Sequence, residues 1–385
     1  MTARTIRICL VSPNALGNLS GLPTGHVGGS EHGQASMARW LARRGHQVSM
    51  VTWDAGKVQD AYDGVTVIKL CAPSAGIRGL RFLHPRWTSL ARALRRADAD
   101  VYHYHCGDLT LGQIVWWCRR HQKRCVYFVG NDVACEPDLP DLEPLRERLL
   151  YRYGLHRVDV VAVQTHQQQR MLLQGFGIAS QVVGTPNDMP LPSGNCGGTE
   201  GSRRVLWIGR VAEQKRLDRL LDVAERLPHL HFDVVGGPNE EAAYASALMR
   251  RAERLSNVAV HGKVPHDRLG PLYQGAAILC CTSDHEGFPQ VFIEAWRHGV
   301  PVVSTVDPDS IIARFGLGRV ASGADGIAAA LAALVASPEE RRRAGAAARI
   351  YAVNHCSLDA TMLRFEKLFL DLVSGSGGRH RNGGE

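Results

Sequence analysis

Two glutamates, eight positions apart, flank the predicted start of a helix. Glu286 lies in a loop, and Glu294 lies about one turn into the helix that follows. Between them, Gly287 lets a ligand approach the backbone because it has no side chain, and Pro289 suits the first turn of a helix. The amides from Phe288 onward have no partner inside the helix and point at whatever lies in front of them. Two carboxylates with free amide donors between them suit a hydroxyl-rich ligand that carries a phosphate.

A buried strand must hold this loop in place. The apolar run ILCCT, residues 278–282, is typical of a strand that is covered on both faces. Gly299 and Pro301 end the helix, and residues 300–305 resume the sheet. The loop is therefore expected at the carboxyl end of a parallel strand, where open α/β sheets bind ligands. The alternative interpretation makes Glu294 an ordinary exposed helix residue, because two glutamates at this spacing also occur by chance.

Two basic residues follow an earlier strand of the same half. Arg210 and Lys215 come shortly after the strand VLWI, residues 205–208. Basic residues in such loops are usually solvated, and that is one interpretation. At a carboxyl edge of the sheet, opposite Glu286, they predict a clamp for a diphosphate.

These stretches resemble the retaining glycosyltransferases of family 4. The resemblance rests on Glu286-Gly-Phe-Pro, Glu294-Ala and Gly299-Val-Pro-Val-Val, and on Gly209-Arg210, Lys215 and Leu217-Asp218-Arg219-Leu220-Leu221. It implies the GT-B fold, an α/β architecture of two facing Rossmann-like doubly wound domains with a deep cleft between them. It also implies that Arg210 and Lys215 contact the donor's phosphates, Glu286 the sugar hydroxyls and Glu294 the ribose. The remaining donor contacts implied are backbone ones, at Val264 near the base and at Gly287, Phe288, Pro289 and Gln290.

A glycine-rich loop opens the amino-terminal half. It follows a predicted strand, residues 6–12, and contains Gly28-Gly29 before an amphipathic helix, residues 35–44. This order begins a doubly wound domain, but the loop lacks the Gly-x-Gly-x-x-Gly fingerprint of dinucleotide sites. The resemblance implies that Gly29 approaches the donor phosphate and the acceptor. The alternative is a flexible loop without a binding role.

The acceptor side is expected at the ends of two further strands. The resemblance implies that the segment DVYHYHC, residues 100–106, lines the cleft, so that His105 could contact the acceptor. Many members of the family have a histidine where this chain has Val129, which leaves Asn131 and Asp132 as the polar candidates. This departure indicates either a different acceptor or a loss of activity.

A zinc site is the alternative interpretation of the same region. Five potential ligands lie near one another in the sequence: His103, His105, Cys106, Cys118 and His121. Their spacings match no familiar zinc finger, and a histidine in a strand is more often a hydrogen-bonded structural residue. We therefore expect no metal.

Length and composition indicate two domains. The chain has 385 residues, 45% of them hydrophobic, which is enough for two globular cores. We expect residues 1–185 with a returning helix at 358–373 to form one domain and residues 203–357 the other. A Pro-, Gly- and Ser-rich linker at 186–202 and a disordered tail at 374–385 complete the prediction. A helix rich in arginine and glutamate is predicted over residues 137–157.

The amino-terminal half is basic. Residues 1–190 contain 22 Lys and Arg against 15 Asp and Glu, whereas residues 191–385 contain 23 against 22. This asymmetry suits an anionic membrane face or a phosphate-bearing lipid acceptor. Nucleic acid is the other interpretation, which the absence of a recognisable binding motif disfavours. The lack of a membrane-length apolar run or signal segment predicts a cytoplasmic protein, and ten cysteines in a chain of this length predict reduced thiols.

The expected activity is transfer of a sugar from a nucleotide-sugar donor to an acceptor hydroxyl, with retention at the anomeric carbon. Arg210, Lys215 and the helix amides would replace a metal by stabilising the departing diphosphate. Two alternatives remain open: a GT-B nucleotide-sugar 2-epimerase and a non-catalytic nucleotide-sugar-binding scaffold. The base, the sugar and the acceptor are not specified by the residues identified above.

Overall fold

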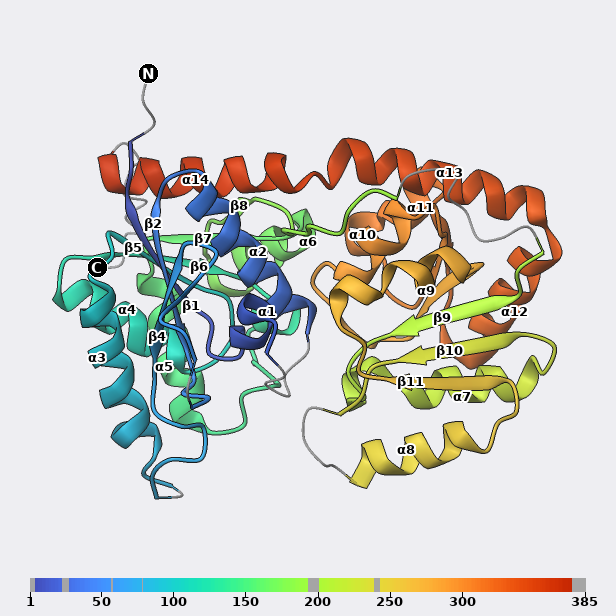
Figure 1. Ribbon diagram of the computed structural model, residues 1–385, viewed down its shortest axis with the longest axis horizontal. Coiled ribbons are helices and arrows are strands. Elements are labelled where there is room, and N and C mark those ends of the chain that lie inside the picture. Colours follow the sequence, from blue (N-terminus) through green and yellow to red (C-terminus); the bar gives the residue numbers. More distant parts are fainter. Residues whose placement is uncertain are drawn as a thin grey trace. The chain divides into compact units, whose positions relative to one another are not determined.

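A computed structural model describes residues 4–22, 28–56, 58–77, 79–192, 201–238 and 243–375 (Figure 1). Its internal contacts divide the chain into two compact units. The first unit contains Met1–His26, Ser30–Pro186 and Leu358–Glu385, and the second contains Val27–Gly29 and Asn187–Ser357. The change of unit falls between Pro186 and Asn187, at the start of the predicted linker. Residues 193–200 of that linker and nearly all of the predicted tail lie outside the described residues.

The first unit is built on an eight-stranded sheet with the order β3-β4-β2-β1-β5-β6-β7-β8. All neighbouring strands are parallel except β3, which pairs with β4 in the antiparallel sense. The strands are β1 (Arg7–Val11), β2 (Gln47–Thr52), β3 (Ala61–Tyr62), β4 (Val65–Lys69), β5 (Val101–Tyr104), β6 (Arg124–Phe128), β7 (Val160–Val163) and β8 (Gln181–Val182). Parallel neighbours require crossover connections, and the helices supply them.

Helices cover both faces of this sheet. One face packs on α3 (Thr88–Ala97), α4 (Thr110–Arg120), α5 (Leu145–Arg157) and α6 (His166–Phe176). The other face packs on α1 (Leu16–Ser20), α2 (Gly29–Arg43) and α14 (Leu358–Ser374). Two short helical segments, η1 (Phe82–Trp87) and η2 (Val133–Cys135), lie in the connections.

Helix α14 follows the whole second unit in the sequence but contributes to the core of the first. Its Met362, Phe365 and Phe369 are fully buried in the same cluster as residues of β1, β2 and β5. Alternation along β5 directs His103 toward Phe365 and Phe369, while Tyr102 and Tyr104 enter the core on the opposite face. The first core is therefore assembled from two segments that are far apart in the sequence.

The second unit is built on a six-stranded, fully parallel sheet with the order β11-β10-β9-β12-β13-β14. Its strands are β9 (Arg204–Ile208), β10 (His231–Val235), β11 (Val258–Gly262), β12 (Ile278–Cys281), β13 (Val302–Ser304) and β14 (Gly318–Val320). The chain first builds outward from β9 to β11 and then returns to the other side of β9 with β12. The order of strands therefore reverses between β9 and β12, which is the switch point where open α/β sheets bind ligands.

The helices of the second unit alternate with its strands. They are α7 (Leu217–Arg226), α8 (Ala243–Glu253), α9 (Gly270–Gly275), α10 (Gln290–Arg297), α11 (Ile311–Phe315), α12 (Gly323–Ala336) and α13 (Pro338–His355), with the short segments η3 (Glu213–Lys215), η4 (His266–Arg268) and η5 (Pro308–Ser310). No helix in the described ranges is both long and apolar enough to cross a membrane.

Two expected helix boundaries were wrong. Residues 137–144 form turns and bends, and α5 begins only at Leu145. Pro137, Pro140 and Pro144 lie in this stretch, and each removes a backbone NH that a helix interior would need. Helix α2 begins at Gly29, six residues before the predicted start, so Gly29 is a helical residue.

Candidate active site at the carboxyl edge of the second sheet

Two loops flank the switch point of the second sheet, one after β9 and one after β12. Lys215 ends η3 in the first loop, and Glu286 lies in the second. The Nζ atom of Lys215 contacts Oε1 of Glu286 as an ion pair. Their side chains are only 22% and 11% exposed, so this contact is largely shielded from water. The structure thus brings together a basic and an acidic residue that the sequence had placed in the donor site.

Hydrogen bonds to backbone oxygens join the two loops directly. The hydroxyl of Thr282 donates to the backbone oxygen of Lys215 at 2.8 Å. The amide of Asp284 donates to the oxygen of Gln214 at 2.9 Å, and the Gln214 side chain donates to the oxygen of His285 at 2.8 Å. Because these bonds link the segments that carry Lys215 and Glu286, the positions of the two charged side chains are coupled.

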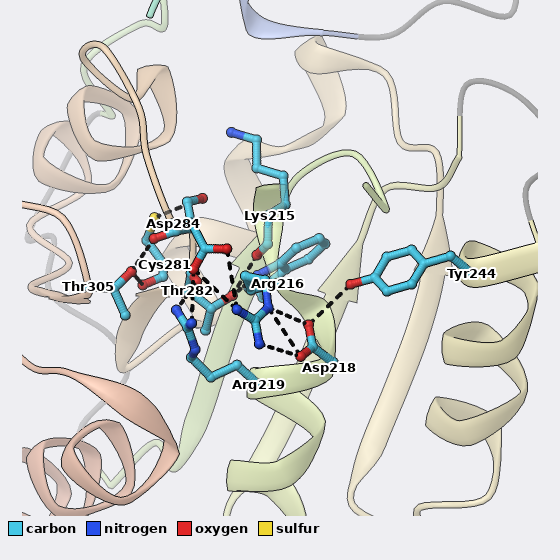
Figure 2. A network of polar contacts seen from close by, with 11 residues as sticks. Lys215, Arg216, Asp218, Arg219, Tyr244, Cys281, Thr282, Asp284 and Thr305 are labelled. Carbon is cyan, nitrogen blue, oxygen red and sulfur yellow. Dashed lines mark hydrogen bonds and ion pairs between the residues drawn. The ribbon is translucent and has the colours of Figure 1, made fainter. Parts of the chain in front are cut away.

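A second layer of ion pairs lies behind these bonds (Figure 2). Asp284 accepts from Arg219 at 2.9 Å and from Arg216 at 3.3 Å. Arg219 also donates to the backbone oxygen of Thr282 at 2.8 Å. In Figure 2 the Lys215 side chain extends away from this cluster, while Arg216 and Arg219 point into it.

Arg216 has a left-handed backbone with φ of 51°, a conformation that costs free energy in a residue with a Cβ atom. Its guanidinium binds Asp218 at 2.8 Å, and the Tyr244 hydroxyl donates to the same carboxylate at 3.1 Å. Burial raises the pKa of Asp218, but the hydrogen bonds from Arg216 and Tyr244 outweigh burial and leave the pKa below its usual range. The unfavourable backbone at position 216 is therefore offset by ion pairs on both sides of the loop.

Arg210 lies in the same loop but is not part of this network. It is exposed, and its guanidinium forms no hydrogen bond or ion pair with any residue in the described part of the chain. Close packing of the strand ends fixes the backbone just before it. Gly236 has φ of 126°, and a Cβ atom at this position would lie 1.8 Å from the backbone oxygen of Gly209. Only glycine at position 236 allows the two backbones to lie this close. The contact involves the backbone of Gly209, so the side chain of Arg210 can still bind a ligand.

The start of helix α10 presents the predicted backbone donors. Pro289 is the N-cap residue, with extended φ and ψ of −61° and 122°, and the helix runs from Gln290. Gly287 is buried, and the Phe288 ring packs edge-on against Trp296 at 6.0 Å between ring centres. The prediction that Pro289 lies inside the first turn was off by one position.

Glu294 is 2% exposed, which rules out the interpretation of an ordinary exposed helix residue. One carboxylate oxygen accepts from the Tyr273 hydroxyl at 2.6 Å. The other is 3.0 Å from Nε2 of His266 and accepts from the Asn187 side chain at 3.2 Å. Burial lowers the pKa of His266, but the hydrogen bond and charge of Glu294 raise it by more, so its pKa lies above the ordinary value.

The sequence did not reveal the partners of Glu294. Asn187 lies 107 positions before it, His266 lies 28 before it and Tyr273 lies 21 before it. Asn187 also donates to the Gln290 side chain at 2.6 Å, so it joins two predicted donor residues. One local feature could have indicated His266: it lies two residues after Val264, the residue predicted to lie near the base. Val264 is half-buried just beyond β11.

The predicted acceptor residues of the first unit lie in loops after β5 and β6. His105 is buried, stacks on Phe128 at 4.6 Å and is 3.0 Å through Nδ1 from the Phe128 oxygen. Burial lowers the pKa of His105 to about 4, so the ring is neutral at pH 7. Asn131 accepts from the Ala134 amide at 3.1 Å, and Asp132 accepts from Gln167 at 3.0 Å. All three side chains thus have local structural bonds.

The neighbouring Val129 is fully buried. The potential zinc ligands of this region do not converge: within the residues that the structure describes, His103, His105, Cys106, Cys118 and His121 form no group that could hold a metal ion.

Two family models match the chain and together cover most of it. The model "Glycosyl transferases group 1" matches residues 202–337, and the model "Glycosyl transferase 4-like domain" matches residues 28–188. The D-inositol 3-phosphate glycosyltransferase of Kribbella flavida is 27% identical over 84% of this chain and 86% of its own length. The mannosylfructose-phosphate synthase of Agrobacterium fabrum is 27% identical over 42% of this chain and 41% of its own.

Solved structures share the fold over almost the whole chain. The sucrose-phosphate synthase of Thermosynechococcus elongatus has a TM-score of 0.79 at 18% identity, covering 96% of this chain and 99% of that one. Anabaena HepE in complex with UDP-glucose has a TM-score of 0.72 at 14% identity, covering 96% and 100%. At these identities the likeness concerns the fold.

Proposed function

Since this chain is a glycosyltransferase of family 4 with the GT-B fold, we propose that it transfers a sugar from a nucleotide-sugar donor to an acceptor hydroxyl with retention of the anomeric configuration and without a metal ion. The observation that carries the proposal is the pairing of Lys215 with Glu286 between two hydrogen-bonded loops at the switch point. An ammonium group and a carboxylate held there match the two ends of a donor, a diphosphate and a sugar rich in hydroxyl groups.

The reaction follows from the charges that develop as the glycosidic bond breaks. The bond's electron pair leaves with the diphosphate, which gains negative charge, while the sugar becomes more positive. Arg210, Lys215 and the backbone donors at the start of α10 stabilise the diphosphate, because donors fixed before the reaction need no reorganisation. Glu286 accepts hydrogen bonds from the sugar hydroxyls and, being anionic, also stabilises positive charge on the sugar. The acceptor hydroxyl attacks the anomeric carbon, and its proton passes to an oxygen of the departing phosphate.

The bonds that the Asp-x-Asp segments already make support a mechanism without a metal ion. The sequence contains two Asp-x-Asp segments, the pattern that could hold a divalent ion. Asp98 and Asp100 of the first segment pair with Arg7 and Lys123. Asp307 of the second accepts from the amides of Ile312 and Ala313 at 2.8 and 3.1 Å. Because these carboxylates are already bonded, Arg210 and Lys215 are the better candidates for neutralising the diphosphate.

We propose Glu294 as the ribose-binding residue, supported by its oriented, buried carboxylate next to Gln290. The proposed acceptor is a polyol that carries a phosphate. The basic composition of residues 1–190 supports this acceptor, as do the phosphate-containing names of the relatives given above. We further propose a cytoplasmic protein whose first unit contacts an anionic membrane surface.

The first experiment is a thermal-shift screen of UDP, GDP, ADP and TDP, because a ligand stabilises the folded state according to its affinity. The matching nucleotide sugar is then incubated with phosphorylated polyols, and the anomeric configuration of the product is determined by NMR. Transfer with retention that survives a chelator supports the proposal. An inverted product or a chelator-sensitive rate contradicts the mechanism.

Incubation of the donor alone separates the alternatives. The relatives are named as transferases and synthases, so no comparison favours an epimerase. A donor whose sugar changes configuration without an acceptor would nevertheless demonstrate one. Nucleotide binding without product from any acceptor would favour the scaffold.

A further inference from the structure

An exposed apolar turn follows strand β4 in the first unit. Ile77, Leu80 and Leu83 are 73%, 60% and 46% exposed. The amide of Leu80 donates to the oxygen of Ile77, and the amide of Leu83 donates to the oxygen of Leu80, each at 3.0 Å. These bonds place the three side chains on consecutive turns of one short coil. A cluster of large aliphatic side chains left in water has an unfavourable free energy unless another surface covers it.

Arginines border this turn along one side of helix α3. The helix buries Leu90, Ala93 and Leu94, and its exposed side carries Arg92, Arg95 and Arg96 at helical spacing. None of these arginines forms an ion pair with a residue in the described ranges. In the sequence, residues 64–97 contain seven Lys and Arg and no Asp or Glu.

A hollow of about 190 Å³ lies between the end of β4 and α3. Its lining includes Lys69, Arg92 and Arg96 together with His84 and Pro85 of the segment that follows the apolar turn. No carboxylate lines it. A recess with basic walls beside an exposed aliphatic turn has the two features of a lipid headgroup site, since phosphate binds the cations and acyl chains cover the apolar side chains.

Helices α4 and α5 extend the same surface. Trp87 packs edge-on against Trp116 of α4 at 5.8 Å, and Trp116 is 47% exposed. Arg146 of α5 lies over the Phe82 ring at 4.4 Å. Tryptophan at an exposed border is typical of membrane interfaces, because one end of the side chain is apolar and the other polar.

We propose that residues 77 and 79–96, with Trp116, form a docking surface for a membrane that contains anionic phospholipids. We call it the basic apolar surface. The inference rests on the proposed membrane contact of the first unit and assigns it to particular residues. Arg92 and Arg96 bind lipid phosphates at the hollow, Arg95 adds attraction to the negative surface, and Leu80 and Leu83 enter the headgroup layer.

The aliphatic side chains favour a bilayer over nucleic acid as the partner. Arginines alone would fit either polyanion, but Ile77, Leu80 and Leu83 would gain nothing from a phosphate backbone. The charge complements an anionic lipid surface, where each basic residue contributes about 1 kcal/mol. Two signals, basic residues and inserted apolar side chains, are also what stable peripheral binding requires.

The test is flotation of the full chain with vesicles of phosphatidylcholine, with and without phosphatidylglycerol. We expect binding only to the anionic vesicles. The variant Arg92→Gln/Arg95→Gln/Arg96→Gln should weaken binding about 100-fold, roughly five-fold for each arginine. The variant Leu80→Ser/Leu83→Ser should weaken it on the order of ten-fold for each leucine, since a transferred leucine is worth about that factor. The thermal unfolding of the first unit, followed without nucleotide, should match that of the wild type in both variants, which shows that they are folded.

The matched control replaces the same residue types on helix α13 of the second unit. Arg342→Gln/Arg343→Gln/Ile350→Ser removes two exposed arginines and an aliphatic side chain that is 62% exposed, and it should float like the wild type. The proposal is overturned if this control loses binding and the surface variants keep it. It is also overturned if the wild type ignores anionic vesicles, or if a short DNA duplex competes for the arginines while the leucine variant still floats. Because flotation needs neither donor nor acceptor, a failure here is distinct from a failure of sugar transfer.

Discussion

In the free protein, the ammonium group of Lys215 already has a partner in Glu286. Both groups are more than three-quarters buried, so removing either one leaves the other charged and poorly solvated. A bound donor would give each group a second partner, the diphosphate for Lys215 and the sugar hydroxyls for Glu286. The ion pair therefore holds both side chains in the orientation that the reaction would use. Because the two charges already neutralise each other, the donor does not have to displace water from two free charges.

Replacing Lys215 by alanine should test this role. We expect a 100- to 1,000-fold lower kcat, the usual effect of removing one fixed donor that stabilises charge in a transition state. The same substitution at Lys367, whose side chain is 80% exposed on α14, should leave kcat unchanged. A Lys215→Ala enzyme that turns over at the wild-type rate would remove Lys215 from the mechanism.

His103 should make the first unit sensitive to acid. Both ring nitrogens are buried without a hydrogen-bond partner among the described residues, and burial lowers its pKa to about 3. In the unfolded chain the pKa is near the ordinary 6.5, so the unfolded state binds the proton first as the pH falls. The stability that neutral His103 contributes is complete above about pH 6.5 and is lost progressively toward about pH 3.

The variant His103→Leu should abolish this dependence. We expect its advantage in unfolding free energy over the wild type to be about 2 kcal/mol larger at pH 5 than at about pH 8. Denaturant titrations of both proteins at the two pH values measure the difference. An advantage that is equal at both would show that His103 is not buried in its neutral form.

At the scale of elements, the loop after β9 and the loop after β12 behave as one unit. Asp284 accepts from Arg216 at the end of the first loop and from Arg219 in the first turn of α7, and the Thr282 hydroxyl donates to the backbone oxygen of Lys215. We infer that Arg216 is a positioning residue for the neighbouring Lys215, because its side chain binds Asp218 and Asp284 on the two sides of the loop.

Two substitutions at position 216 separate the backbone from the side chain. Arg216→Ala loses the ion pairs and keeps the unfavourable left-handed backbone, whereas Arg216→Gly loses the pairs but relieves the backbone, so it should be about 1 kcal/mol more stable than Arg216→Ala. Both should lower the preference of the protein for a nucleoside diphosphate over the monophosphate, since Lys215 loses its fixed position. Calorimetric titration with UDP and UMP, or with the pair chosen by the screen, measures this ratio.

Arg319→Ala provides the control for a purely structural effect. Arg319 forms a two-pronged pair with Glu340 in the same unit. Its loss should change stability without changing the diphosphate preference. If Arg216→Ala lowers stability but keeps the wild-type preference, Arg216 has no positioning role.

The strands were the most predictable elements, because their apolar runs are local. Residues 278–282 and 205–208 lie in or directly beside β12 and β9, as expected. The stretch 137–144 was missed because charged and apolar residues around the prolines imitate a helical pattern. In the site, Arg210, Lys215, Glu286 and Glu294 are found on one unit because their motifs are short. Asn187, His266 and Tyr273 were not found, since only folding brings them to Glu294.

At the scale of the molecule, the chain forms most of the first unit, then the second unit, and finally adds α14 to the first unit. Phe365 and Met362 of α14 are fully buried in the first core. The stretch Asn187–Ser357 of the second unit precedes α14 in the chain, and the first unit resumes at Leu358. The cut that would isolate the first unit at residue 186 would therefore also remove part of its core.

Phe365→Ala should destabilise the first unit by about 3–5 kcal/mol, the range for removing a buried aromatic ring. Leu363→Ala on the same helix, at a position that is 49% exposed, should change stability by less than about 0.5 kcal/mol. Thermal unfolding of both variants with and without nucleotide distinguishes the units, because the nucleotide should stabilise the second. Equal melting temperatures for the two variants would contradict the packing of α14.

Helix α14 also determines when the first unit can finish folding during translation. A ribosome makes residues 30–186 long before it makes residues 358–374. While the second unit is translated, the nascent first unit lacks α14, and the part of its sheet that α14 covers stays exposed. Domains usually fold in the order in which they emerge. In this chain the first unit is synthesised first, but it can complete its core only after the second unit has been made. During that interval, chaperones would have to bind the exposed part of its sheet.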